Sequence, residues 1–225
     1  MTEFFVASAI FLLSHSIPAS SAIRGRLTVF LGERTYLILY SILSLCLLAW
    51  LISAARRAPF VPLWDASIGQ YYVPVILMFP AFMLFVGGAV SPNPLSIAFS
   101  RRSFDPDRPG IVAVTRHPIP SSFALWGFAH CVPNGDLVSL IMFGGFGLFA
   151  LAAMPLIDRR KRRQPEADWQ RLAAGTSIMP FAGRGPNRWP PGSLAMTLIG
   201  GTLLYLLMFW LHPILIGPDP KAIFA

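Results

Sequence analysis

Charged side chains are scarce in this sequence of 225 residues. Asp, Glu, Lys and Arg together make up 12% of it, against roughly 25% in a typical soluble domain. Hydrophobic residues make up 55%. This composition excludes an ordinary soluble domain and indicates an integral membrane protein. We expect a single domain over residues 1–225, because one helical bundle can hold the whole chain.

Acidic residues and several common motifs are also missing. The 10 Asp and Glu residues are nearly absent from the apolar runs, so a carboxylate-based proton or sodium relay lacks its parts. The sequence has no Walker loop and no Gly-x-Gly-x-x-Gly, which removes support for nucleotide binding. It also has no Cys-x-x-Cys-His, so any haem would be b-type rather than covalently attached. The two cysteines, Cys46 and Cys131, lie in apolar segments, which predicts buried thiols rather than a disulfide.

Apolar runs that approach the roughly 20 residues needed to cross a bilayer recur along the chain. We predict an all-α, polytopic transmembrane helical bundle of about six spans, because helices satisfy their own backbone groups in lipid. The predicted spans are 3–21, 36–54, 73–90, 119–133, 137–157 and 194–212. The fourth is short, and the turn signal in the sequence PNGD that follows it predicts an antiparallel hairpin with the fifth. A re-entrant hairpin is the alternative.

Basic residues gather in alternate loops. Most of the 18 lysines and arginines fall in the first, third and fifth predicted loops. Such loops stay on the cytoplasmic side, so we predict both termini on the opposite side. Glu3 and the lack of Lys or Arg before the first apolar run argue against a cleaved signal peptide. Topology and contact with membrane lipid therefore explain the net charge of +8, and nucleic acid is not needed as a partner.

Two histidines, His15 and His130, lie inside long apolar stretches with no charged residue beside them. An ionisable ring at this depth is costly and by default faces the interior of a bundle. At 1.5 Å per residue, His15 lies roughly 18 Å from one surface and His130 roughly 16 Å from the other, so both lie within about 4 Å of one depth. One haem iron between the first and fourth spans would fit. Packing or hydrogen bonding between helices is the other interpretation.

Three further residues are candidates at the predicted membrane surfaces. His117 and His212 each precede a proline near the end of a predicted span, where they suit helix termination or a proton or substrate site. Arg116 suits an anion or a lipid phosphate, although the charge bias of the loop explains it equally well. The DRRKRR cluster at 158–163 predicts a stop-transfer signal and a contact with anionic lipid. The segment PEADWQRLAA predicts a short surface helix with Trp169 facing the headgroups.

Several segments resemble the NnrU family of bacterial membrane proteins. They are TRHPIPSSFALWGFAHCVPNGD at 115–136, the run ending MPLIDRRKRR, and the segments FLLSHSIPAS, LGERTYLILYSILSL and LHPILIGP. The resemblance covers nearly the whole chain. It implies a multi-pass protein of the bacterial inner membrane with both termini periplasmic, associated with nitrite and nitric oxide metabolism during denitrification.

The same pattern is distantly similar to 15-cis-zeta-carotene isomerase, a b-type haem membrane protein that isomerises a carotenoid double bond. Carried over, its haem histidines fall on His15 and His130, and the block TSIMPF at 176–181 is also similar. The isomerase has a cysteine three residues before the second histidine, which is implicated in a redox-dependent ligand change. Here that position is Gly127, and Cys131 follows the histidine instead.

These observations lead to one main functional prediction and three alternatives. The main prediction is an NnrU-type membrane protein with haem b on His15 and His130, linked to nitrogen oxide metabolism or membrane redox chemistry. One alternative is a haem-dependent isomerase of a carotenoid-like polyene, which would bind an apolar small molecule. A second is a non-enzymatic membrane assembly factor. A methyltransferase also carries Arg-His-Pro, but here Ile119 and Pro120 replace the expected tyrosine and Glu166 stands without a paired glutamate.

Overall fold

The computed structural model describes residues 1–16, 21–100, 102–163 and 169–224. Over these residues the chain forms helices joined by turns and loops, with no strand beyond one isolated bridge pair. The predicted all-α fold class is therefore confirmed. The chain divides into two compact units. Unit 1 comprises residues 1–63 and 136–142, and unit 2 comprises residues 64–135 and 143–225.

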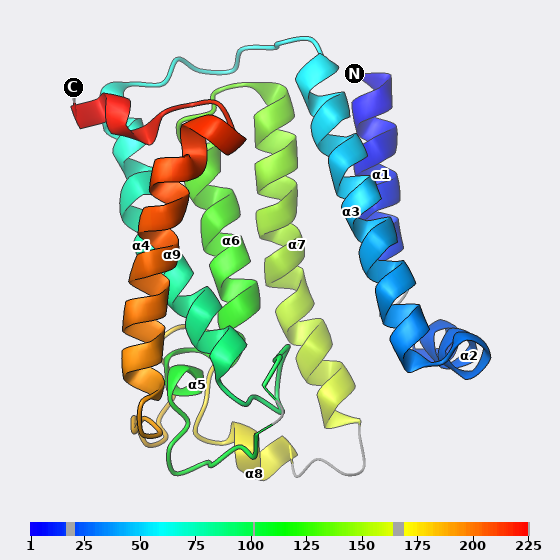
Figure 1. Ribbon diagram of the computed structural model, residues 1–225, viewed down its shortest axis with the longest axis vertical. Helices are drawn as coiled ribbons and strands as arrows, with labels where there is room; N and C mark the ends of the chain where they lie inside the picture. The colour runs from blue at the N-terminus through cyan, green and yellow to red at the C-terminus, as the bar shows by residue number, and fades with distance from the viewer. Residues whose placement is uncertain (17–20, 101, 164–168, 225) are drawn as a thin grey trace. The chain divides into compact units, whose positions relative to one another are not determined.

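Unit 1 is built on a pair of long helices. Its helices are α1 (Thr2–Ser16), α2 (Ser21–Leu31) and α3 (Glu33–Arg57). α1 packs along α3, and α2 turns away at the start of α3 (Figure 1). Gly32 makes that turn with φ 77°, a conformation that favours glycine. Residues 22–31 were predicted as a loop, so the helix α2 is a correction. The rest of the predicted first span, 17–20, lies outside the described residues.

Unit 2 contains most of the chain. Its elements are α4 (Ile68–Val90), α5 (Ile111–Val114), α6 (Pro118–Cys131), α7 (Leu137–Arg162, from Phe143 onward), α8 (Trp169–Ala173), α9 (Ser193–Leu215) and the 3-10 helix η2 (Pro220–Phe224). α4 packs against both α6 and α9 (Figure 1).

Glycines allow these helices to approach closely. A Cβ on Gly88 would lie 2.8 Å from the side chain of Ile119 at the start of α6. A Cβ on Gly201 of α9 would lie 2.6 Å from the sulfur of Met83 on α4. Small residues at such contacts are the usual means by which membrane helices pack, since apolar burial gives little driving force in lipid.

Four helices are long and apolar enough to cross a membrane, namely α3, α4, α7 and α9. No more than 22% of the apolar window of any of them is buried within the protein. Lipid would cover the remaining apolar surface, so the structure supports a membrane protein. These helices contain the predicted second, third, fifth and sixth spans. α1 and α6 contain most of the predicted first and fourth spans. They are shorter than the other four helices, with 15 and 14 described residues, or about 22 and 21 Å of helix.

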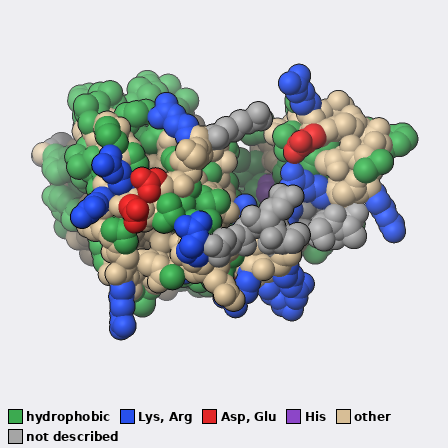
Figure 2. Space-filling model, turned by 90° about the horizontal axis from the view of Figure 1, so that it is seen from below, with side chains coloured by type: hydrophobic (Ala, Val, Ile, Leu, Met, Phe, Trp, Pro, Cys, Tyr) green, Lys and Arg blue, Asp and Glu red, His purple; other side chains and the backbone are tan. Residues whose placement is uncertain are grey.

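The third and fifth predicted loops lie together at one end of unit 2, where α4 and α7 end and α6 and α9 begin (Figure 1). We call this the loop end. Among its described residues, the third loop contains one helix, the four-residue α5. It is nevertheless well packed, because Leu95, Ile111 and Val112 bury their side chains together with Ala173. Seen from below, several Lys and Arg side chains project from the surface at separate places (Figure 2).

Candidate functional site

His15 lies near the end of α1 in unit 1, with its ring half-buried. Its Nδ1 lies 2.7 Å from the carbonyl oxygen of Phe11, one helical turn earlier. A carbonyl oxygen only accepts hydrogen bonds, so Nδ1 carries the proton and Nε2 carries the lone pair. The ring stacks on Phe11 with centroids 4.1 Å apart and lies 5.9 Å from the ring of Tyr40. The imidazole is thus fixed in one tautomer and one orientation.

His130 lies near the end of α6 in unit 2 and is arranged in the same way. Its Nδ1 donates to the carbonyl oxygen of Trp126 at 2.9 Å. Its ring centroid lies 5.5 Å from that of Trp126 and 5.3 Å from that of Phe143 on α7. A metal-binding histidine usually donates its second ring N–H to a backbone carbonyl, which fixes its tautomer. Both His15 and His130 satisfy this requirement, with Nε2 as the ligating atom.

The two histidines belong to different units, and each is described in its own surroundings. Over the described part of the chain there is no group of three or more His, Cys, Asp or Glu residues that could hold a metal ion. Axial ligation of a haem needs only two side chains, so this finding leaves the haem site untouched. The shared haem iron remains a prediction.

The Arg-His-Pro sequence lies at the loop end, where α6 begins. Pro118 occupies the first turn of α6, where its missing N–H has no helical partner to lose. The Arg116 backbone is held on both sides: its N–H donates to the Ser177 carbonyl at 2.7 Å, and its own carbonyl accepts from the Asn93 side chain at 2.9 Å. Segments far apart in the sequence therefore meet at this residue.

The guanidinium of Arg116 is buried and fully engaged. Nη1 pairs with the carboxylate of Asp158, near the end of α7. Nε and Nη2 donate at 2.9 Å to the side chain and the carbonyl of Thr176. The ring of Trp169 lies 5.1 Å from Arg116 on one side and 4.3 Å from the Arg162 guanidinium. A lipid phosphate at Arg116 would have to compete with these partners, Asp158 among them. Trp169, which was predicted to face the headgroups, packs on the two arginines.

His117 is fully buried beside this ion pair. Its Nδ1 lies 2.8 Å from the Ser96 hydroxyl, and its Nε2 lies 3.1 Å from Oδ1 of Asp158. By the usual geometric criteria, neither of these two atoms has a hydrogen-bond partner among the described residues. Burial lowers the pKa of His117, which the Asp158 charge opposes and the Arg116 charge reinforces. Because Arg116 already neutralises Asp158, we expect a neutral imidazole.

His212 lies near the end of α9, half-buried at the opposite end from the Arg116 network. Its Nδ1 donates to the carbonyl oxygen of Pro218 at 2.7 Å, and its own carbonyl accepts the backbone N–H of Ile216 at 2.8 Å. Both bonds connect the last turn of the helix to the chain that follows it. This arrangement agrees with the predicted role in helix termination.

Gly127, one turn before His130, lies directly against the backbone of α7. A Cβ at this position would lie 2.6 Å from the Phe143 carbonyl oxygen and 2.8 Å from the Gly147 backbone nitrogen. Backbone atoms cannot move aside as a flexible side chain does. The position that holds a cysteine in the carotene isomerase is therefore closed to any side chain in this structure.

Sequence analysis missed Asp158, Asn93 and Thr176 as members of the Arg116 network. Asp158 entered the predictions only as the first residue of a basic cluster, although it is an acid that directly follows a long apolar run. That position was the one available signal. Arg116 and Asp158 are 42 residues apart in the sequence, and no local pattern predicts their pairing.

Comparison with known proteins gives one match. The sequence model of a family described as NnrU protein matches residues 3–220. No curated protein and no solved structure matches the chain. The matched range includes every candidate residue described above, from His15 on α1 to His212 on α9.

Proposed function

This chain belongs to the NnrU family of membrane proteins, and we propose that it binds haem b through His15 and His130 and serves redox chemistry in the membrane. One observation carries the proposal. Each of the two imidazoles donates Nδ1–H to the carbonyl four residues earlier, at 2.7 and 2.9 Å. Both rings are thereby prepared to offer Nε2 to a metal.

The residues around each histidine supply orientation and shielding. Phe11 and Tyr40 flank His15, while Trp126 and Phe143 flank His130. Aromatic side chains packed against an imidazole limit the access of water to it. They also help to keep the imidazole in the orientation set by its hydrogen bond to the backbone carbonyl. A haem held by two histidines supplies one-electron redox chemistry and favours electron transfer over gas binding. The link to nitrite and nitric oxide metabolism in the bacterial inner membrane follows from the family resemblance.

The isomerase alternative has less support because of Gly127. The ligand change attributed to the isomerase uses a cysteine at this position, and here the backbone of α7 occupies the space a side chain would need. Electron transfer requires no such residue. The assembly-factor alternative would be favoured if the purified protein bound no haem.

The direct test is an absorption spectrum of the purified full-length protein after expression with added haem precursor. We expect a Soret band in the wild type, and its loss in both His15→Ala and His130→Ala. Exogenous imidazole should restore part of the band in the alanine variants, because it can replace the missing ligand. A purely structural histidine would not give this rescue.

His212→Ala provides the matched control, because His212 also donates Nδ1–H to a backbone carbonyl. We expect its Soret band to match that of the wild type. Circular dichroism confirms that each variant retains its helices. A wild-type protein with no Soret band, or equal loss in His212→Ala, would overturn the proposal.

A further inference from the structure

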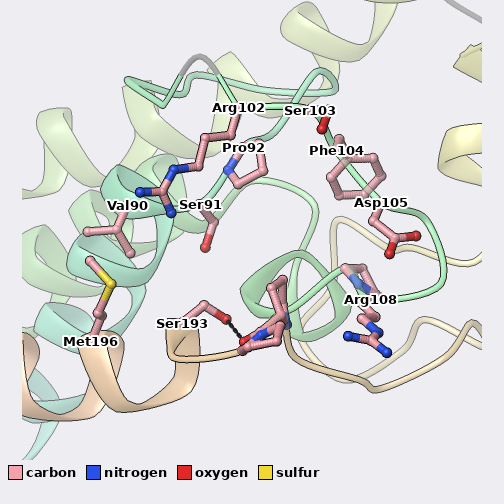
Figure 3. Close-up of a pocket in the computed structure, with 13 residues that line it drawn as sticks. Val90, Ser91, Pro92, Arg102, Ser103, Phe104, Asp105, Arg108, Ser193 and Met196 are labelled. Atoms are coloured by element: carbon pink, nitrogen blue, oxygen red, sulfur yellow. Dashed lines mark hydrogen bonds between the residues drawn. The ribbon is translucent and has the colours of Figure 1, made fainter.

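A pocket lies at the loop end of unit 2, between the end of α4, the loop residues 102–109 and the start of α9 (Figure 3). Its volume is about 210 Å³. α4 and α9 are both long and apolar enough to cross a bilayer. A pocket at their ends lies where acyl chains give way to lipid headgroups. None of its lining residues belongs to the Arg116 network or to the proposed haem site.

We propose that this pocket binds a phosphate group, with an anionic phospholipid as the expected source. The charge of the pocket supports this proposal. Arg102 and Arg108 both line the pocket, and neither side chain has an ion-pair partner within the described ranges. Asp105 also lines it, so the charged side chains leave a net positive pocket. Arginine is well suited to phosphate because its planar fork donates two parallel hydrogen bonds.

A buried hydroxyl without a hydrogen-bond partner, that of Ser91, also supports the proposal. Ser91, the residue after α4, is only 4% exposed, and its Oγ has no hydrogen-bond partner in the described part of the chain. In Figure 3 this hydroxyl points into the space that Ser193 borders from below. A buried hydroxyl left unpaired costs about 1–3 kcal/mol. A phosphate oxygen in the pocket would accept its hydrogen bond and remove that cost.

The start of α9 borders the same pocket. Its N-cap is Gly192, which has no side chain to satisfy the first N–H groups of the helix. Helix N-termini favour anions because these N–H groups and the helix dipole both attract negative charge. The remaining wall is apolar, with Val90, Phe104 and Met196. An apolar wall beside a basic one suits the glycerol and the first acyl carbons of a phospholipid.

The test uses native mass spectrometry of the delipidated full-length protein, with phosphatidylglycerol as probe and diacylglycerol as the phosphate-free comparison. We expect the wild type to bind phosphatidylglycerol and to bind diacylglycerol much more weakly. The R102Q/R108Q double variant should bind phosphatidylglycerol on the order of tenfold more weakly. Arg159→Gln is the matched control, because Arg159 is exposed on α7 and does not line the pocket. Equal loss in this control would overturn the proposal.

Inorganic phosphate, monitored by phosphorus NMR, distinguishes the two sources of the group. Binding of phosphatidylglycerol alone supports a lipid site, and competition by inorganic phosphate supports a soluble phosphate ligand. Equal binding of phosphatidylglycerol and diacylglycerol by the wild type, without binding of inorganic phosphate, would contradict both.

Ser91→Ala separates binding from folding. Removal of an unpaired hydroxyl should leave the unfolding temperature of the lipid-free protein unchanged or raised. The same substitution should weaken phosphatidylglycerol binding, because the phosphate loses a donor. A lowered unfolding temperature with unchanged phosphatidylglycerol binding would assign Ser91 a structural role and overturn the proposal.

Discussion

The two ends of α6 each carry a histidine, and the surrounding structure uses them differently. At the start, His117 is fully buried, with Ser96 and Asp158 close to its two ring nitrogens. Near the end, His130 is half-buried and makes one ring hydrogen bond, through Nδ1 to Trp126. Both rings make one hydrogen bond through Nδ1, but Nε2 of His117 is fully buried against the carboxylate of Asp158 and leaves no room for a ligand. We infer that His117 stabilises the fold, whereas Nε2 of the half-buried His130 is available to a ligand.

The difference also concerns how charge is accommodated. The loop end buries a cation, a carboxylate and an imidazole in one network, with Arg116 and Asp158 about one-tenth exposed. At His130 the ring contacts are instead with Trp126 and Phe143. We infer that stability depends on the start of α6 and that cofactor binding depends on its end. The predictions that follow test this division.

The largest expected effect is at Asp158. Asp158→Ala leaves the Arg116 guanidinium buried without its counter-charge, and such losses cost about 3–5 kcal/mol of stability. The R116M/D158L double variant should recover part of this loss, because no unpaired charge remains. Unfolding temperatures in detergent measure both effects.

Asp219→Asn is the control, since Asp219 pairs with Lys221 at 3.7 Å on the surface. An exposed pair of this kind contributes about 1 kcal/mol or less. If Asp158→Ala were no more destabilised than Asp219→Asn, the Arg116 network would not be the stabilising element described above.

A smaller loss of stability is expected where α6 approaches α7. Gly127→Ala forces a Cβ to within 2.6 Å of the Phe143 carbonyl in the present backbone, and overpacking of this kind costs about 1–3 kcal/mol. Gly145→Ala on α7 is the matched control, because its Cβ would meet nothing within 4 Å. Replacing a mid-helix glycine with alanine stabilises by about 0.5–1 kcal/mol, so the two variants should shift the unfolding temperature in opposite directions. Shifts of the same sign and size would contradict the close contact.

The sequence predicted much of this fold because helical membrane spans are encoded locally. Long apolar runs specify α3, α4, α7 and α9 without reference to the rest of the chain. α2 was missed because its boundary depends on the positive φ of Gly32, and its composition resembles that of a basic loop. The packed loop end was missed for a different reason. Its order comes from contacts such as Asn93 to Arg116 and Arg116 to Ser177, which join distant segments.

The haem site on His15 and His130 stays a prediction, but the sequence alone singles out both residues. His15 and His130 stand out because an imidazole is rare in an apolar run, and their tautomers follow from helical geometry once the ring rotamer is known. The structural role of His117 was not predictable, because Arg-His-Pro followed by a span is equally typical of an exposed membrane rim. Only the fold brings Ser96 and Asp158 to that ring.

After the Gly127 effect, the next largest expected effect is a dependence of the protein's stability on pH. Because the pKa of His117 is lowered in the folded protein, the unfolded chain binds a proton more readily just below pH 6.5, the ordinary value. Stability should therefore fall as the pH decreases below about 6.5, by at most about 1.4 kcal/mol per pH unit for one proton. His117→Gln should flatten this dependence in unfolding temperatures measured from pH 7.5 down to 5. A slope unchanged by this substitution, or one that matches the slope of His212→Gln, would contradict the assignment.

The smallest effect on stability is expected at His130. His130→Ala removes one hydrogen bond to Trp126 and the ring contacts with Trp126 and Phe143, and it leaves no buried charge without its partner, so the loss should be about 1 kcal/mol. Thermal unfolding of the haem-free wild type and haem-free His130→Ala gives this value without a contribution from the cofactor. A loss as large as that of Asp158→Ala would remove the distinction between the two ends of α6.

The most direct measurement compares haem content and unfolding temperature in His130→Ala and His117→Gln, purified side by side with the wild type. We expect His130→Ala to lose its Soret band and to keep its helices. We expect His117→Gln to keep the Soret band in the molecules that remain folded, and to unfold at a lower temperature than the haem-free His130→Ala. A full Soret band in His130→Ala would contradict the central claim.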